Sequence, residues 1–240
     1  MNRRPSRRAR PASLSSKPAA APMGRQAPRL RATLALAAVS AALAGCGSSA
    51  PVHYYTLQGP SAPAAAGTGA ASAAYLIDVQ PVSISTQADQ PQLMVRTGDG
   101  SVSALYSERW SSPLGDELRG ALSDALKRDL GALDVQMVKP GPGAAVWRVQ
   151  TDVQRFELVA GSMAQLDATW RVRPVNMKGA GLLCRSVVTE TVAEAGVPAL
   201  IAAQQRAVSA LAATMASAIR GQAPASSASV QMLGCSPLKD

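Results

Sequence analysis

Several short stretches of the chain alternate hydrophobic and polar residues, a period of two that is typical of strands with one buried face. The alternation is clearest in residues 166–173. Its apolar positions, which we expect to face a core, are Leu166, Ala168, Trp170 and Val172, and its polar positions are Asp167, Thr169, Arg171 and Arg173. Further strands are predicted at 75–80, 92–97, 101–107, 133–138, 146–159 and 182–192. In 146–159 the buried face shifts near Arg155, which predicts a β-bulge.

Two longer stretches repeat their apolar residues every three to four positions, which predicts helices with one apolar side. For the first helix, Ser112 suits the N-cap, Pro113 the first helical position and Gly131 the C-terminal cap. The second helix begins at Pro198 and ends at Gly221. Because such a helix must bury its apolar side against another layer, we expect both helices to pack on a sheet.

The predicted order of elements is β-β-β-α-β-β-β-β-α, in which the Gly98-Asp99-Gly100 turn joins two strands in a hairpin. This order favours an α+β fold, a two-layer domain whose mostly antiparallel sheet carries both helices on one face. We place this domain at 75–221. Residues 222–240 are predicted to form an irregular tail. Residues 58–74, rich in Ala, Gly, Pro and Ser, are predicted to form a flexible linker.

Charge is distributed unevenly along the chain. The 240 residues carry a formal net charge of +9. Nine of the 24 basic residues and none of the acidic ones lie in residues 1–45, so the remaining 15 basic residues balance all 15 acidic residues. The basic character therefore belongs to the first segment. The rest of the chain gives no indication of the basic surface that a nucleic-acid-binding protein needs.

The first segment has the layout of a secretory signal. Its apolar stretch, 32–44, has 13 residues, fewer than the roughly 20 that cross a bilayer. The basic residues just before this stretch are Arg25, Arg29 and Arg31. We therefore predict a signal peptide over 1–45. Translation from Met23 would leave a shorter signal, a hypothesis that a peptide from residues 1–22 in the unprocessed protein would refute.

The end of this segment, Leu43-Ala44-Gly45-Cys46, resembles the lipobox of bacterial lipoproteins. The thiol of Cys46 would receive diacylglycerol, and several acyl chains would anchor the protein stably, whereas one chain binds a membrane only marginally. Gly47 is typical of lipoproteins sent to the outer membrane. We therefore predict a lipidated N-terminus and linker over 46–74, on the periplasmic face of the outer membrane. The alternative is a core cysteine that follows an apolar helix.

Two further cysteines, Cys184 and Cys235, follow the lipobox. An oxidising compartment would allow a disulfide between them, which would tie the tail to a strand, and two free thiols are the alternative. Their spacing does not fit a metal site, and the one histidine, His53, lies near the predicted anchor. The sequence has no nucleophile elbow, P-loop or dinucleotide fingerprint. We therefore expect no enzymatic activity and no metal or cofactor.

Two pairs of residues are candidates for contacts with a membrane or a partner. Tyr54 and Tyr55 would lie near the anchor, either at the membrane interface, where aromatic residues with a polar tip are favoured, or in a short edge strand of the body. Arg171 and Arg173 share the solvent side of one strand and could meet an acidic partner or lipid phosphates. A solvated strand face is the simpler interpretation of these arginines.

A series of short motifs behind the lipobox resembles the PqiC-like family of ABC-type transport auxiliary lipoproteins. The motifs lie at 54–57, 77–84, 90–96 and 106–126, and the resemblance covers most of the chain from Cys46 to about residue 220. Each motif is weak alone, but their order and spacing are fairly specific. Members commonly have Asp-Arg-Pro-Gln where this chain has Asp89-Gln90-Pro91-Gln92, so a contact made by that arginine is in doubt here.

The resemblance implies a non-catalytic periplasmic subunit of an envelope system that contains an MCE-domain protein, moves lipids between the two membranes and supports membrane integrity. It implies docking on the MCE-domain protein, and an axial tunnel would suit a homo-oligomer. The candidate partner contacts are Tyr54, Tyr55, Arg96, Arg109 and Trp110. Core packing is the simpler interpretation of Trp110, and Arg96 and Arg109 could instead form surface ion pairs.

Two other functions are compatible with the sequence. One is a scaffold lipoprotein for envelope assembly that works without a transporter. The other is a lipoprotein hydrolase whose site is assembled from scattered Asp and Ser residues. A neighbouring gene for an ATPase, a permease or an MCE-domain protein would favour the transport role over both.

Overall fold

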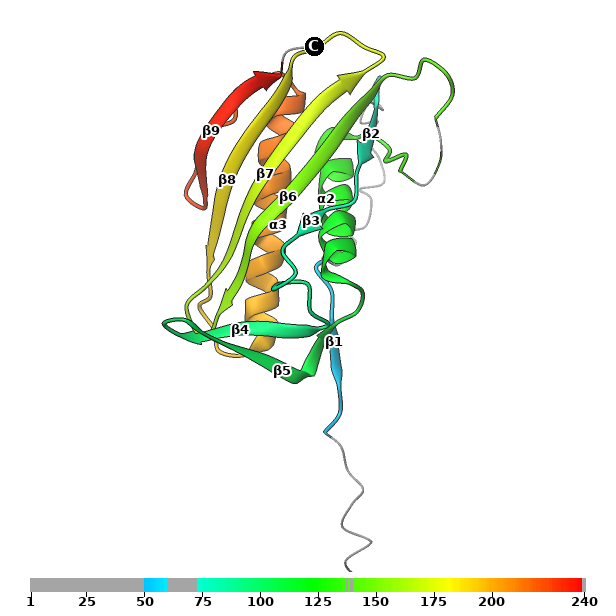
Figure 1. Cartoon of the computed structure of the whole chain (residues 1–240). Coiled ribbons are helices and arrows are strands. Elements are labelled where there is room, and N and C mark those ends of the chain that lie inside the picture. The colour runs from blue at the N-terminus through cyan, green and yellow to red at the C-terminus, as the bar shows by residue number, and fades with distance from the viewer. Residues whose placement is uncertain (1–49, 60–72, 137, 139, 239–240) are drawn as a thin grey trace, which may run out of the picture. The chain divides into compact units, whose positions relative to one another are not determined.

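The computed structural model describes residues 50–59, 73–136, 138 and 140–238, all within the unit Ala50–Asp240 (Figure 1). The predicted signal peptide, Cys46 and residues 60–72 of the predicted linker lie outside the described residues. The strands are β1 (His53–Tyr55), β2 (Leu76–Val79), β3 (Ser83–Ile84), β4 (Gln92–Gly98), β5 (Ser101–Trp110), β6 (Val146–Val159), β7 (Met163–Val175), β8 (Gly181–Thr191) and β9 (Val230–Leu238). The helices are α2 (Leu114–Leu130) and α3 (Val197–Ile219).

The strands form one sheet, and both helices lie behind the same face of it in Figure 1. The strand order is β1-β5-β4-β6-β7-β8-β9, and β2 and β3 pair with β6. Helix α3 packs on β7 and β8, and α2 packs on α3 and lies against β2 and β3. The two-layer α+β architecture with both helices on one face therefore agrees with the prediction.

The sheet is mostly but not purely antiparallel. Four strand pairs are antiparallel, namely β4–β5, β6–β7, β7–β8 and β8–β9. The pairs β1–β5, β2–β6, β3–β6 and β4–β6 are parallel. Parallel pairing of β2 and β3 with β6 is possible because the long connection between them includes the crossover helix α2.

The central strands confirm the predicted alternation and the predicted bulge. The apolar positions of β7, Leu166, Ala168, Trp170 and Val172, are buried. In β6 the pairing register with β7 shifts between Val153 and Arg155. The buried residues of β6 include Val149 and Val153 before the shift and Leu158 after it, so the buried positions change from odd to even numbers.

The ends of α2 agree with the sequence at one end and differ at the other. Pro113 is the N-cap residue, and the hydroxyl of Ser112 donates to the carboxylate of Glu117 instead of capping the backbone. At the C-terminal end Gly131 has a φ of 64°, and its N–H donates to the carbonyl of Lys127, as expected for a left-handed cap. No helix in the described ranges combines the length and the apolar character that spanning a bilayer requires.

Two predicted segments differ from the structure. The tail 222–240 is not irregular throughout, because β9 forms within it and pairs with β8. The strand predicted at 133–138 does not form among its described residues, where Asp134 makes only an isolated bridge to Ile77. The carboxylate of Asp134 instead accepts hydrogen bonds from Arg119 of α2 and from backbone groups, and these bonds hold the segment beside α2.

The N-terminal tyrosines belong to the folded body. Strand β1 pairs in parallel with β5, so the edge-strand interpretation of Tyr54 and Tyr55 is confirmed. Leu57 is only 2% exposed and lies in the hydrophobic core. The prediction that a linker over 58–74 separates the tyrosines from the body is therefore wrong, and so is the domain boundary at residue 75. Strand β1 has three residues, too few for a repeating pattern, so the local sequence does not show which strand it pairs with.

Candidate functional site

The chain just after β1 is fixed to the start of α2 by one buried carboxylate. Glu117 Oε2 accepts hydrogen bonds from Thr56 Oγ1 at 2.6 Å and from the Leu57 N–H at 2.9 Å. Its Oε1 accepts from the hydroxyls of Ser111 at 2.6 Å and Ser112 at 2.7 Å. Burial raises the pKa of Glu117, but these four hydrogen bonds outweigh burial and hold the pKa below its ordinary value. The group therefore stays ionised near neutral pH.

Two backbone carbonyls of the same segment accept further hydrogen bonds. The Ser111 N–H donates to the carbonyl of Tyr55 at 2.8 Å. The side-chain amide of Gln205, on α3, donates to the carbonyl of Thr56 at 3.0 Å. The segment that leads from the N-terminus into the body is thus bonded to the residue after β5, to α2 and to α3.

A second carboxylate, on β5, faces β1. His53 Nδ1 lies 3.0 Å from Glu108 Oε1, in a pair of residues that are also in register between the two strands. The Glu108 carboxylate raises the pKa of Tyr55 to about 12. Hydrogen bonding to Tyr55, and then to His53, lowers the pKa of Glu108. The short strand β1 is thereby held by side chains as well as by its backbone ladder.

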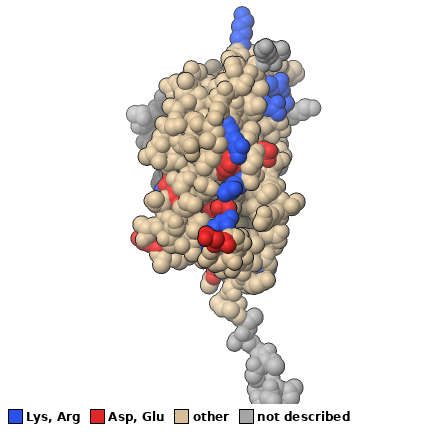
Figure 2. All heavy atoms as spheres, turned by 60° about the vertical axis from the view of Figure 1, so that its left-hand side comes forward, with Lys and Arg blue, Asp and Glu red and all other residues tan. Residues whose placement is uncertain are grey.

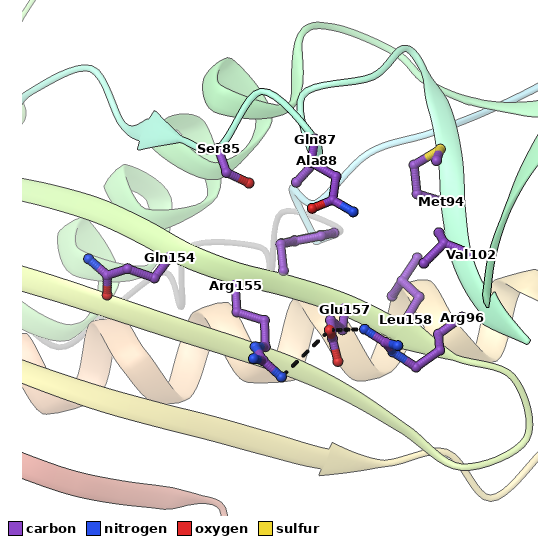
Figure 3. A pocket seen from close by; sticks show the side chains of 11 residues that line it. Ser85, Gln87, Ala88, Met94, Arg96, Val102, Gln154, Arg155, Glu157 and Leu158 are labelled. Carbon is purple, nitrogen blue, oxygen red and sulfur yellow. Dashed lines mark hydrogen bonds and ion pairs between the residues drawn. The ribbon is translucent and has the colours of Figure 1, made fainter. Parts of the chain in front are cut away.

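A pocket of about 260 Å³ opens where the β4–β5 hairpin meets β6 (Figure 3). Its polar wall comes from the segment between β3 and β4, with Ser85 and Gln87, and from Gln154 on β6. Its apolar residues are Ala88, Met94, Val102, Phe156 and Leu158, and its charged residues are Arg96, Arg155 and Glu157. Residues 85–102 and 154–158, about 50 positions apart in the sequence, therefore form one concave surface.

The charged residues of this pocket meet at one oxygen atom. Arg96 Nη2 donates to Glu157 Oε1 at 2.5 Å, and Arg155 Nη1 lies 3.7 Å from the same oxygen. Figure 3 shows the two arginines reaching Glu157 from either side. Hydrogen bonding to Glu157 raises the pKa of Arg96, so its guanidinium remains charged at any physiological pH. Two positive charges thus share one negative charge.

The candidate partner contacts from the sequence fall in different places. Tyr54 is 65% exposed beside Arg109, its register partner on β5, whereas Tyr55 is half-buried. Arg96 lies in the pocket and pairs with Glu157. Trp110 does not fit the prediction of a partner contact, because it is only 5% exposed and packs edge-on against Phe156, with ring centroids 5.8 Å apart. Its burial leaves it in the core, the interpretation that the sequence favoured.

The functional residues that sequence reasoning missed are Glu117, Arg155 and Glu157. Glu117 and its neighbour Asp116 are acidic residues in the first turn of α2, where they suit the helix dipole, and nothing in the local sequence indicates that Glu117 is buried. The two serines just before α2 could have indicated a shared hydrogen-bond acceptor. The pocket could not be found in this way, because its walls are joined only by long-range pairing of β4 with β6.

The solvent face of the sheet carries basic and acidic residues in alternation, which Figure 2 shows as a row of blue and red side chains. Within this face Arg185 binds Asp167 through two hydrogen bonds, of 3.0 and 2.8 Å. Arg171 and Arg173 are exposed on β7. This mixture of signs supports a solvated strand face over a site for lipid phosphates.

The two later cysteines are joined. Cys184 on β8 and Cys235 on β9 are register partners and form a disulfide across 51 positions of sequence. Among the described residues, no group of three or more His, Cys, Asp and Glu side chains could hold a metal ion.

Comparisons with known proteins add a family and a fold. Residues 55–216 match the family described as ABC-type transport auxiliary lipoprotein component. A comparison with curated proteins found no match. The chain is similar to the crystal structure of an uncharacterized protein, with 16% identity and a TM-score of 0.56, over 71% of this chain and 99% of that one. It is also similar to protein XCC0632 from Xanthomonas campestris, assigned to family DUF330, with 18% identity and a TM-score of 0.47, over 70% and 93% of the two chains.

The first of these structures shares the fold, and its low identity carries no functional conclusion. The family match is different in kind, because it covers more than half of the chain, from the last residue of β1 through the pocket and α2 into the last turns of α3. The family is one of transport subunits and not of enzymes. This chain therefore belongs to the family of ABC-type transport auxiliary lipoprotein components.

Proposed function

We propose that the protein is a lipid-anchored, non-catalytic subunit of an envelope transport system that contains an MCE-domain protein. In this proposal Cys46 is acylated, and the body lies on the periplasmic face of the outer membrane, where the system moves lipids and supports membrane integrity. Membership of the auxiliary lipoprotein family supports the transport role. The lipobox and Gly47 support the anchor and its membrane.

The observation that carries the proposal is the docking of β1 on the body. Only residues 47–52 separate Cys46 from β1. Fully extended at about 3.5 Å per residue, the chain from Cys46 to His53 spans about 25 Å. Because β1 and Leu57 are fixed to the body by Glu108 and Glu117, an acylated Cys46 would keep the end of the body that carries β1 within about that distance of the bilayer.

A body held this close to a membrane by a short tether is suited to the end of a transport assembly. It can present its remaining surface to a partner that reaches across the periplasm. We propose the MCE-domain protein as that partner, and a homo-oligomer would let several copies surround its end. The description of the family, a transport auxiliary component, supports a non-catalytic role.

A pull-down of the native lipoprotein, followed by mass spectrometry, tests the transport role. We expect the MCE-domain protein, with or without its permease and ATPase, among the proteins recovered. Recovery of envelope-assembly proteins with no transport component would contradict the proposal and favour the scaffold alternative. The protein should be extracted in mild detergent, so that the acylated form and its neighbours stay together.

Mass measurement of the Cys46→Ser variant tests the anchor. We expect an uncleaved precursor without fatty acid, because the hydroxyl cannot replace the thiol that accepts diacylglycerol. The matched control removes the other two cysteines, Cys184→Ser with Cys235→Ser, and should be acylated normally. Normal acylation and cleavage of Cys46→Ser would overturn the anchor assignment.

A further inference from the structure

We infer that the pocket between the β4–β5 hairpin, β6 and residues 85–88 binds a carboxylate side chain, with an adjacent apolar side chain, from an acidic segment of a partner protein. The inference rests on the proposed function and deepens it, because it names the surface on which the transport partner would dock.

The charges of the pocket leave one guanidinium with free capacity. Arg96 is committed to Glu157, whereas Arg155 Nη1 lies 3.7 Å from Glu157 Oε1, beyond a hydrogen bond. The side chain of Arg155 is 57% exposed. A guanidinium presents five N–H donors in a planar fork that matches a carboxylate with two parallel hydrogen bonds. An incoming carboxylate could therefore accept hydrogen bonds from Arg155 that Glu157 does not accept.

Neighbouring acidic residues do not use this capacity. Asp167 is the register partner of Arg155 on β7, but Arg185 occupies both of its carboxylate oxygens. Asp99, in the β4–β5 turn, acts on Arg96. The lining residues themselves include two arginines and one glutamate, a formal excess of one positive charge. The pocket is therefore complementary to a single negative charge.

The size and walls of the pocket favour side chains over a lipid. Sites for drug-sized ligands occupy roughly 300–1,000 Å³, and this pocket holds about 260 Å³. That volume suits a pair of side chains and is too small for the acyl chains of a phospholipid. Met94, Val102 and Phe156 line one part of it, so an apolar side chain next to the carboxylate would be covered. A bare phosphate would leave this apolar part empty.

Irregular strand pairing surrounds the pocket. The β4–β5 ladder shifts register between Gln92 and Leu93 and again between Arg96 and Gly98. The β6–β7 ladder shifts between Val153 and Arg155. Bulges bend strands and redirect side chains, and they are common beside binding sites. Here they frame the wall that carries both arginines.

Arginine side-chain NMR of the full mature protein, in detergent micelles, tests the inference. The probe is the capped dipeptide N-acetyl-Asp-Leu-amide, and its neutral counterpart is N-acetyl-Asn-Leu-amide. We expect the Nε–H signals of Arg155 and Arg96 to shift with saturation, with an affinity for the Asp dipeptide at least about tenfold higher. Equal affinity for the two dipeptides would overturn the inference, because charge would then play no part.

Variants and competing probes sharpen the test. Arg155→Gln should remove the preference for the Asp dipeptide, whereas Arg171→Gln, which changes an exposed arginine of β7 outside the pocket, should retain it. Inorganic phosphate or phosphatidylglycerol vesicles that shift the Arg155 signal more strongly than the dipeptide would replace the protein segment with a phosphate group and overturn the inference.

The pull-down separates this inference from the proposed function. If wild type recovers the MCE-domain protein, we expect Arg155→Gln to recover several-fold less and Arg171→Gln an equal amount. Equal recovery by Arg155→Gln would remove the pocket from the docking surface and leave the transport role standing. Failure of wild type to recover any transport component would contradict the transport role, and the dipeptide titration would still decide whether the pocket binds a carboxylate.

Discussion

The carboxylate of Glu117 accepts the backbone N–H of Leu57, a residue 60 positions earlier in the chain, at 2.9 Å. This bond makes the N-terminal segment part of the fold. A buried carboxylate with four donors is stable only while it is ionised and all four donors reach it. The entry of the chain into the body therefore depends on one side chain of α2.

Glu117→Gln should destabilise the protein by about 1–3 kcal/mol, because the amide turns one acceptor into a donor and leaves a buried partner unsatisfied. Urea unfolding of the mature protein would measure this change, and hydrogen exchange should show faster exchange of the Leu57 amide. Asp116→Asn, on the exposed neighbour in the same helical turn, is the control and should change stability by less than about 0.5 kcal/mol. Equal effects of the two changes would show that only the helix dipole is involved.

The lowered pKa of Glu117 predicts how stability depends on pH. A carboxyl group whose pKa is lower in the folded than in the unfolded chain stabilises the fold above its unfolded value, and this stabilisation is lost as the pH falls through the folded value. We expect the stability difference between wild type and Glu117→Gln to be constant above about pH 5 and to shrink at lower pH. Urea titrations at a series of pH values would check it. A difference that does not change with pH would contradict the assignment.

Reduction of the Cys184–Cys235 disulfide should lower the free energy of unfolding by up to about 4 kcal/mol, the value expected for a closed loop of this length. Among the described strands, β9 pairs with β8 alone, so its amides should exchange faster once the bond is reduced. Unfolding of oxidised and reduced protein, with exchange measured on both, tests this. Identical midpoints would show that backbone pairing alone holds β9.

Gln204→Met should stabilise the protein by about 1–2 kcal/mol. Gln204 lies fully buried on α3, and neither its amide nitrogen nor its oxygen has a hydrogen-bond partner among the described residues. Methionine has a similar shape and leaves no polar atom unpaired. The adjacent Gln205→Met is the control and should give no gain, since Gln205 donates to the carbonyl of Thr56. A loss of stability in Gln204→Met would reveal a partner such as a buried water.

Trp110→Ala should cost about 3–5 kcal/mol, because it removes a buried indole and its contact with Phe156. Tyr106→Ala removes a 74% exposed ring from the same strand and should change stability by less than about 0.5 kcal/mol. Thermal unfolding of both variants gives the comparison. An unchanged melting temperature for Trp110→Ala would return this residue to the partner surface.

The sequence predicted well where a local pattern repeats. The alternation around Trp170 is long enough to define a buried face, and the shift near Arg155 marks its own bulge. Strand β9 was missed because it lies at the edge of the sheet, where Val230 and Met232 are its main inward residues and the residues that follow are mostly exposed. With only one paired side and one partly covered face, such a strand leaves little periodicity to detect.

The candidate site was harder to predict because its parts meet only in the folded chain. Arg96 and Glu157 are 61 positions apart, and nothing in either local sequence indicates the other. Glu117 looked like an ordinary acidic residue of a first helical turn, and its burial follows from the return of Leu57 to that place. The motifs were enough to suggest the family, but the pocket could be located only once the order of the strands in the sheet was known.

The parallel pairing of β1 with β5 also has a mechanical meaning. A force applied at the N-terminal end of β1 acts along the strand, so it loads the hydrogen bonds between the two strands in shear, all at once, and does not open them one after another. The hydrogen bonds of Thr56 and Leu57 to Glu117 come next along the chain, so they would bear the load after the strand pairing. If a partner pulls the body away from the bilayer, the pairing of β1 with β5 and the bonds to Glu117 would thus bear the force before the rest of the body does.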